Sequence, residues 1–159
     1  MKAKKMLLVA LASAIAATSF SGITQAQTRY FSFVTPNATN SASTAFGPHE
    51  FVVAVNNPVL ADQIASIIEG NTWHGDPVHI EGKIVRGRVA YNEEYPFHLN
   101  PDSLKLFSNN IEHCSATAFE VEEHLDLVGV PGSGFLQKGI WCPWDSRFVR
   151  EIRYPYPAQ

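Results

Sequence analysis

The stretch Phe51-Val52-Val53-Ala54-Val55-Asn56-Asn57-Pro58 passes from a strand into a helix, and it carries some of the clearest structural signals in the chain. A short apolar run rich in valine is typical of a buried strand. Asn57 then supplies a helix cap, and Pro58 suits the first helical position. The apolar stripe that follows lies on one helix face and ends at a glycine: Leu60, Ile64, Ile67, Ile68 and Gly70.

The segments beyond this helix also alternate between strand and helix character. Residues 78–85 repeat with a period of two, residues 104–114 form a long strand with an internal bulge, and residues 147–153 form the last strand. Between them, residues 115–128 carry a helical apolar stripe that Gly129 closes.

The order from Glu50 onward is therefore strand, helix, strand, strand, helix, strand. It predicts an α+β fold in which an antiparallel sheet carries two helices on one face. A split βαβ (ferredoxin-like) sandwich has this order, and so do other α+β layouts.

Four segments are predicted along the chain. Residues 1–26 have a basic start, a short apolar run and small residues at their end, which is typical of a cleaved signal peptide. Residues 27–47 are expected to be loosely ordered, with an edge strand at Tyr30–Val34. Residues 48–154 form one α+β domain and residues 155–159 a C-terminal tail. The protein is thus expected to be secreted or periplasmic, with no membrane contact after cleavage.

The charge balance excludes one class of partner. The chain has 12 Lys and Arg against 15 Asp and Glu, and the signal segment holds three of the lysines and none of the acids. The remainder therefore has nine basic and 15 acidic residues, a net charge of −6. Binding to nucleic acid depends on neutralising phosphates, so nucleic acid is not an expected partner.

The two cysteines are expected to form a structural disulfide. Cys114 and Cys142 lie 28 positions apart in a chain predicted to be exported, where disulfides persist. A reactive thiol pair is the alternative, but the Cys-x-x-Cys spacing that tunes thiolates is absent. The bond would hold the segment Trp141-Cys142-Pro143-Trp144 against the Cys114 segment.

Three motifs resemble those of a known family: His98-Leu99-Asn100-Pro101-Asp102-Ser103, Val121-Glu122-Glu123-His124-Leu125-Asp126 and Trp141-Cys142-Pro143-Trp144-Asp145-Ser146-Arg147. They are similar to small secreted bacterial proteins of the calmodulin-binding-protein-like family, labelled after the amino-terminal domain of a larger eukaryotic protein. The resemblance runs from Phe51 to Ile152, and the last motif is the most specific. The family favours aspartate where this chain has Asn100.

The family label implies calmodulin as a partner, but the residues do not favour it. Calmodulin targets are typically basic amphipathic helices. Neither predicted helix is basic, and the second one is strongly acidic. Calmodulin is also cytosolic, whereas this chain is expected to be exported.

The residues favour a non-enzymatic protein-binding domain. The loop from Pro131 to Gly139 precedes a cysteine, and secreted protease inhibitors often present an extended segment from such a loop. A secreted protease is therefore the sharpest candidate partner, and no cofactor is expected. Either tryptophan could instead fill the core beside the disulfide. The residues expected to contact the partner are Tyr95, His98, Phe135, Leu136, Lys138, Trp141, Trp144 and Arg147.

The alternative function is a small secreted hydrolase or metal-dependent enzyme that uses His98, Glu123 and His124. Glu120 and His124 have the helical spacing of a metal-ligand pair, but two ligands are too few. Gly132-Ser133-Gly134 lacks the flanking pattern of a nucleophile elbow. The sequence therefore gives the enzyme no positive support.

Overall fold

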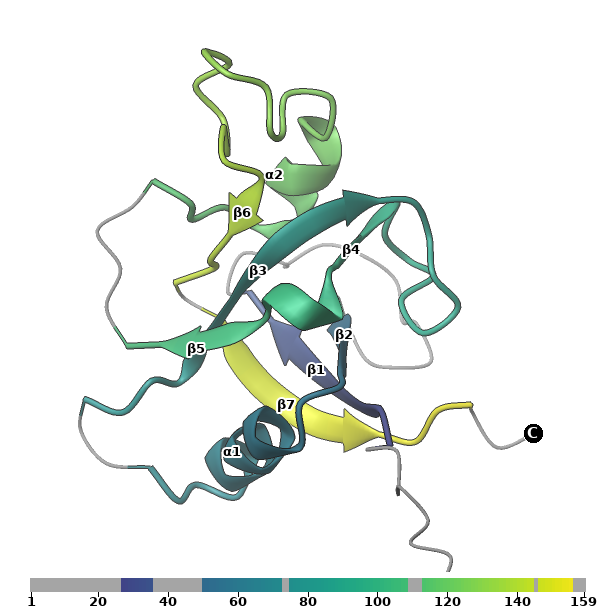
Figure 1. Ribbon diagram of the computed structural model, residues 1–159, viewed down its shortest axis with the longest axis vertical. Coiled ribbons are helices and arrows are strands. Elements are labelled where there is room, and N and C mark those ends of the chain that lie inside the picture. Colours follow the sequence, from purple (N-terminus) through teal and green to yellow (C-terminus); the bar gives the residue numbers. More distant parts are fainter. Residues whose placement is uncertain (1–26, 36–49, 73–74, 109–112, 145, 156–159) are drawn as a thin grey trace, which may run out of the picture.

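Two antiparallel sheets form the centre of the molecule. A computed structural model of the protein describes residues 27–35, 50–72, 75–108, 113–144 and 146–155 (Figure 1). The first sheet has the order β2-β1-β7, from Phe51–Val55, Arg29–Val34 and Arg147–Ile152. In the second, the long strand β3 pairs with three short ones: His79–Arg86 with Phe97–Leu99 (β4), Lys105–Phe107 (β5) and Ile140–Trp141 (β6).

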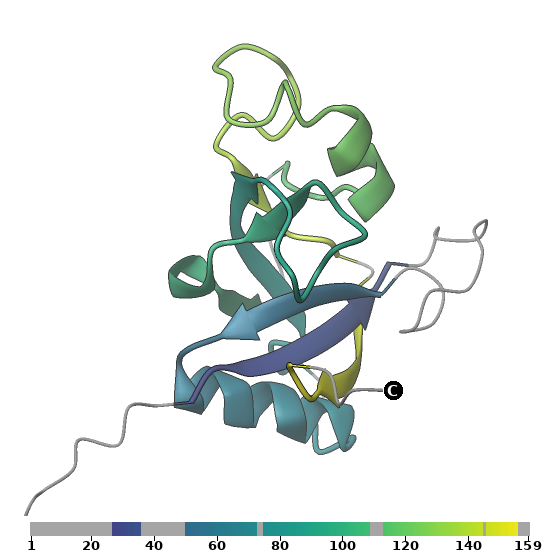
Figure 2. The same cartoon turned by 90° about the vertical axis from the view of Figure 1, so that its right-hand side faces the viewer.

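The described part of the chain also holds two α-helices and one 3₁₀ turn. They are α1 (Pro58–Ile68), α2 (Ala118–Glu123) and η1 (Pro101–Ser103). None of the described helices combines the length and hydrophobicity needed to cross a bilayer. Figure 1 and Figure 2 place α1 and α2 at opposite ends of the sheets.

The fold class predicted from the sequence is confirmed: antiparallel strands, two helices and one disulfide. The ferredoxin-like layout is wrong, because the strands divide between two sheets and the helices do not share one face. The strand predicted at Tyr30–Val34 is present as β1, but its predicted position at the edge of the sheet is wrong. β1 lies between β2 and β7, and its Phe31 and Phe33 are fully buried, so this part of residues 27–47 belongs to the core.

Helix α1 forms where the sequence predicts it because its signals are local. The side chain of Asn57 accepts hydrogen bonds from the backbone of Val59 and Leu60 at 3.0 and 3.3 Å. Pro58 follows at the first position, and Leu60 and Ile64 are buried.

Helix α2 is shorter than the predicted range 115–128. A capping box between Thr117 and Glu120 starts it, as expected from such a pair. It ends at Glu123, after which Arg86 on β3 donates hydrogen bonds to the carbonyl groups of Leu125 and Val128 at 2.9 and 2.8 Å. The apolar stripe therefore continues in turns that are fastened to β3.

The predicted strand 104–114 is also shorter in the structure. Strand β5 ends at Phe107, and the 3₁₀ turn η1 separates it from β4, which the sequence did not predict. Residues 109–112 of the predicted strand lie outside the described residues, as do the signal segment and residues 36–49.

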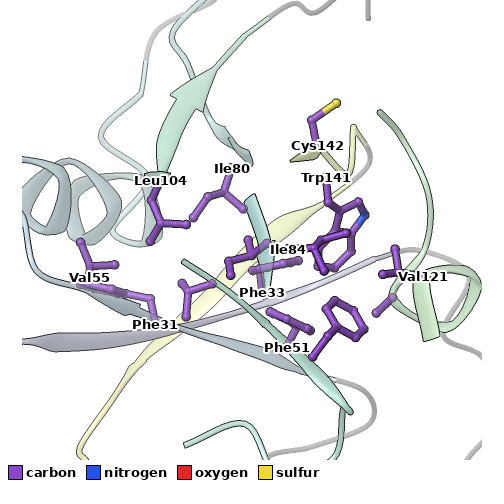
Figure 3. Packing of buried hydrophobic residues seen from close by; sticks show 14 of the residues in the cluster. Phe31, Phe33, Phe51, Val55, Ile80, Ile84, Leu104, Val121, Trp141 and Cys142 are labelled. Atoms are coloured by element: carbon purple, nitrogen blue, oxygen red, sulfur yellow. The ribbon is translucent and has the colours of Figure 1, made fainter. Parts of the chain in front are cut away.

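The core between the sheets is aromatic. The indole ring of Trp141 lies 5.6, 5.0 and 5.6 Å from the rings of Phe33, Phe51 and Phe97. Figure 3 shows Phe33, Phe51 and Trp141 of this cluster between strands of both sheets, with Val121 of α2 beside them. The single indole N–H donates to the carbonyl of Ala116 at 2.8 Å, so burial leaves no polar atom of this side chain unsatisfied.

Candidate functional site

The predicted disulfide between Cys114 and Cys142 is present. Their Cα atoms are 5.2 Å apart, within the usual range for the bond, and both residues are buried. The backbone N–H of Cys142 also donates to the carbonyl of Cys114 at 2.9 Å. This double link fixes the segment before α2 against the segment that follows β6.

A turn-rich loop from Gly129 to Gly139, here called the anchored loop, precedes β6. At its neck the N–H groups of Gly129 and Gly139 both donate to the carbonyl of Leu136, at 3.0 and 2.7 Å. The carbonyl of Gly139 accepts from Ile84 on β3 at 2.8 Å. The loop base is thus held by β3 and, three residues later, by the disulfide at Cys142.

The inside of the anchored loop differs from the extended segment that the sequence predicted. Leu136 has a φ of 39° and is only 5% exposed, so it points into the protein rather than toward a partner. Phe135 is half-buried, with its ring 5.2 Å from that of His124. Gly132 and Gly134 also have positive φ values, which produce turns rather than an extended strand.

The outside of the anchored loop presents a different set of residues. The exposed ones are Gly129, Val130, Pro131, Gly132, Gly134, Gln137 and Lys138. The side chain of Gln137 accepts from the N–H of Gly132 at 3.1 Å, which braces the two sides of the loop. Of the three residues predicted to make contact here, only Lys138 is exposed.

A pocket of about 330 Å³ lies where the anchored loop meets the disulfide. Its lining comes from the loop, from the first residue of β6 and from the segment before α2: His113, Cys114, Gly134, Leu136, Gln137, Lys138 and Ile140. The apolar side chains come from Leu136 and Ile140, and the polar ones come from His113, Gln137 and Lys138.

The sequence profile of the N-terminal domain of calmodulin-binding protein 74 matches residues 28–155, which include every strand and helix from β1 to β7. The chain belongs to this N-terminal domain family. No curated protein and no solved structure matches it. The match begins before β1, so this strand, which the motif resemblance left out, is part of the family domain.

Three other residues predicted to contact a partner are buried or half-buried. Trp141 is fully buried and is a core residue, because its ring fills the space between the sheets. Tyr95 is 5% exposed. Its burial raises the pKa of its hydroxyl above the ordinary value, and the nearby carboxylates of Glu94 and Glu122 raise it further. Trp144 is half-buried, with its ring 5.6 Å from that of Phe107.

The two remaining predicted contact residues lie outside the pocket lining. His98 is half-buried on β4, and its Nδ1 is 3.0 Å from the carbonyl oxygen of Gly87. Arg147 is exposed at the start of β7. The structure therefore brings Phe135, Leu136 and Lys138 together at the loop, and leaves His98 and Arg147 on other strands.

The residues proposed for the alternative enzyme come from β4, which carries His98, and from the end of α2, where Glu123 and His124 lie. Among the described residues, no group of three or more His, Cys, Asp and Glu side chains lies close enough to hold a metal ion. His124 instead packs against Phe135, and Glu123 is exposed at the end of α2.

Two surface features were missed by sequence reasoning. Tyr30, Tyr91 and Tyr154 form a cluster with ring centroids 4.9 to 6.2 Å apart. Burial raises the pKa of Tyr91, and the neighbouring Tyr30 raises it further. Arg29 donates to Glu151 and Asp62, each at 2.7 Å, and so joins β1 to β7 and α1. Neither feature has a local signal, since its members are dispersed along the chain.

Proposed function

We propose that this domain is an exported, non-enzymatic protein-binding domain whose partner contacts α2 and the anchored loop. The observation that carries the proposal is the rigid attachment of the loop through β3, its own neck and the disulfide. A loop already held in one conformation loses less conformational freedom when a partner binds.

Exposed apolar side chains support this location. Among the described residues, four large apolar side chains are exposed: Phe119 at 64%, Val130 at 43%, Val59 at 65% and Val149 at 37%. The first two belong to α2 and the anchored loop, at one end of the molecule in Figure 1. The acidic side chains of Glu120, Glu122 and Glu123 are exposed around Phe119. An aromatic centre with a charged rim is typical of a binding surface.

A capture experiment tests the proposal with two variants and two matched controls. Purified disulfide-bonded protein is used as bait for proteins in the medium and cell envelope of the producing cells. We expect Phe119→Asp and Val130→Asp to reduce capture of one specific protein by roughly tenfold, as truncation of hot-spot residues does. Val59→Asp and Val149→Asp place the same charge on exposed residues of α1 and β7, and should leave capture unchanged. Equal capture by all four variants would contradict the proposed surface.

A more specific proposal is that this protein partner is a secreted protease. The support is the small domain and the loop anchored beside a disulfide. The turns within the loop do not fit strand-like insertion into a protease cleft, so inhibition would come from blocking access to it. Stoichiometric inhibition of one member of a panel of extracellular proteases, with the loop uncut, would support this version. Cleavage of the loop without inhibition would exclude it.

A further inference from the structure

The first strand begins very close to the point where the signal segment is expected to be cut. Thr24 and Ala26 are small residues at the positions that a signal peptidase recognises, so cleavage after Ala26 would make Gln27 the first residue of the exported chain. Strand β1 begins at Arg29, immediately after Thr28. The new N-terminus would therefore lie beside the central strand of the first sheet rather than at the end of a long tail.

The side chain of Gln27 is unconstrained, whereas the residues after it are held. Gln27 is exposed and lies outside the strand pairing, which starts with Arg29 and Val55. Among the described residues, none forms a hydrogen bond with its side chain. The next residue, Thr28, donates from its hydroxyl to the side chain of Asn56 at 2.8 Å. The amide of Gln27 can therefore fold back on its own backbone nitrogen without breaking a contact.

We propose that Gln27, as the N-terminal residue of the exported protein, is converted to pyroglutamate. Its free α-amine attacks the side-chain carbon Cδ, so that a bond forms between the α-nitrogen and Cδ while the bond between Cδ and Nε2 breaks. The amide nitrogen leaves as ammonia and takes the proton that the amine loses. The product is a lactam ring that has lost the positive charge of the terminus, and the reaction needs no oxidant, reductant or cofactor. The inference rests on the export in the proposed function, to which it adds a modification.

The ring would protect contacts that start immediately behind the terminus. Aminopeptidases remove residues one at a time from a free α-amine, and pyroglutamate offers none. Arg29 donates to Glu151 and Asp62, each at 2.7 Å, so trimming of the chain through Arg29 would remove the ties of β1 to β7 and α1. A closed ring at residue 27 would preserve these ties after export.

Mass spectrometry of the exported, disulfide-bonded protein tests the proposal. We expect its N-terminal peptide to start at residue 27 and to be lighter than the encoded peptide by one ammonia molecule. Pyroglutamyl aminopeptidase should then remove that residue from the peptide and leave Thr28 first. An isotope-labelled synthetic peptide that starts with an unmodified Gln27, added before digestion, should keep its full mass and so controls for cyclisation during handling.

Gln27→Asn is the matched control variant. It keeps a side-chain amide but is shorter, so cyclisation would have to close a smaller and strained ring. Its N-terminal peptide should therefore keep the full encoded mass.

A wild-type peptide that starts at residue 27 with its full mass would overturn the proposal while leaving the predicted cleavage site intact. A peptide that starts at any other residue would also overturn it, and would show that cleavage after Ala26 is wrong. Neither result affects the capture experiment on Phe119 and Val130, so this inference and the proposed binding surface fail separately.

Discussion

Asn92 joins the two sheets through one buried amide. Its Oδ1 accepts a hydrogen bond from the N–H of Val52 on β2 at 3.0 Å, and its Nδ2 donates to the carbonyl of Phe97 on β4 at 3.2 Å. The residue is only 3% exposed, so water cannot readily replace either bond. One side chain therefore satisfies backbone groups from two strands of different sheets.

The first prediction concerns this residue. Asn92→Ala leaves a buried donor and a buried acceptor without partners, and should lower the free energy of unfolding by about 1–3 kcal/mol. Chemical denaturation measures the change. Asn71→Ala is the control, because the side chain of Asn71 is exposed and donates to the exposed Glu69, and it should change stability by less than about 0.5 kcal/mol.

At the scale of elements, Arg29 connects β1, β7 and α1. The hydrogen bond from its guanidinium group lowers the pKa of Glu151 below the ordinary value of 4.5, and it outweighs the opposing effect of burial. A carboxyl group whose pKa is lower in the folded state stabilises the fold above its ordinary pKa. That stability is lost as the pH falls through the folded-state pKa.

The second prediction follows from this loss of stability at low pH. Glu151→Gln should lower stability at pH 7 and flatten the loss of stability on acidification below about pH 5. Denaturation curves at a series of pH values measure both effects. Glu123→Gln, at an exposed carboxylate on α2, should keep the wild-type pH dependence, and an identical response from both variants would contradict the role of the Arg29 pair.

The third prediction concerns the disulfide. Replacing Cys114 and Cys142 together with serine should lower the free energy of unfolding by about 3–4 kcal/mol on the chain-entropy estimate for a loop of 28 residues. Denaturation with and without a reducing agent measures it. The double variant should no longer respond to the reducing agent, and a wild-type protein equally stable in its presence would contradict the prediction.

What the sequence could predict depended on where the signals lie. The cap at Asn57 and the stripe of α1 are local, and the helix forms where they predict it. The end of α2 depends on Arg86, which is about 40 residues away, so the apolar stripe alone extended the helix too far. The alternation of β1 identified a strand but could not name its neighbours, because β7 lies at the other end of the chain.

The candidate site likewise has features that the sequence could predict and features that depend on the folded structure. The disulfide was predictable from two cysteines in a chain with a predicted export signal, and it is present. The inward direction of Leu136 depends on its positive φ within a series of glycine turns, which residue types alone did not reveal. For Trp141 and Trp144, residue types alone left both core and surface open, and only packing between the sheets decides that Trp141 belongs to the core.

On the scale of the whole molecule, the first and last strands are neighbours. Tyr30 pairs with Ile152 and Val34 pairs with Arg147, so β1 is central only when the C-terminal strand is in place. Strand β7 also contributes Phe148, whose ring is 6.2 Å from that of Phe33 in the core. The sheet therefore depends on contacts between residues more than 100 positions apart.

The fourth prediction tests this dependence. A chain that ends at Ser146 lacks β7 and should show no cooperative unfolding transition, because β1 loses one side of its pairing and the core loses Phe148. A chain that ends at Pro155 keeps β7 and is the control, which should melt cooperatively. Thermal denaturation followed by circular dichroism compares the two, and a cooperative transition in the shorter chain would show that β7 is dispensable.

The pairing of β1 with β7 also determines when the chain can become compact. A chain emerging from the ribosome keeps Phe31 and Phe33 without their final neighbours until the segment up to residue 152 has been synthesised. Non-local pairing of this kind forms late, because the intervening chain must first be brought together. The export predicted from residues 1–26 would benefit from this delay, since a chain that is not yet compact can still pass through a translocation channel in an extended form.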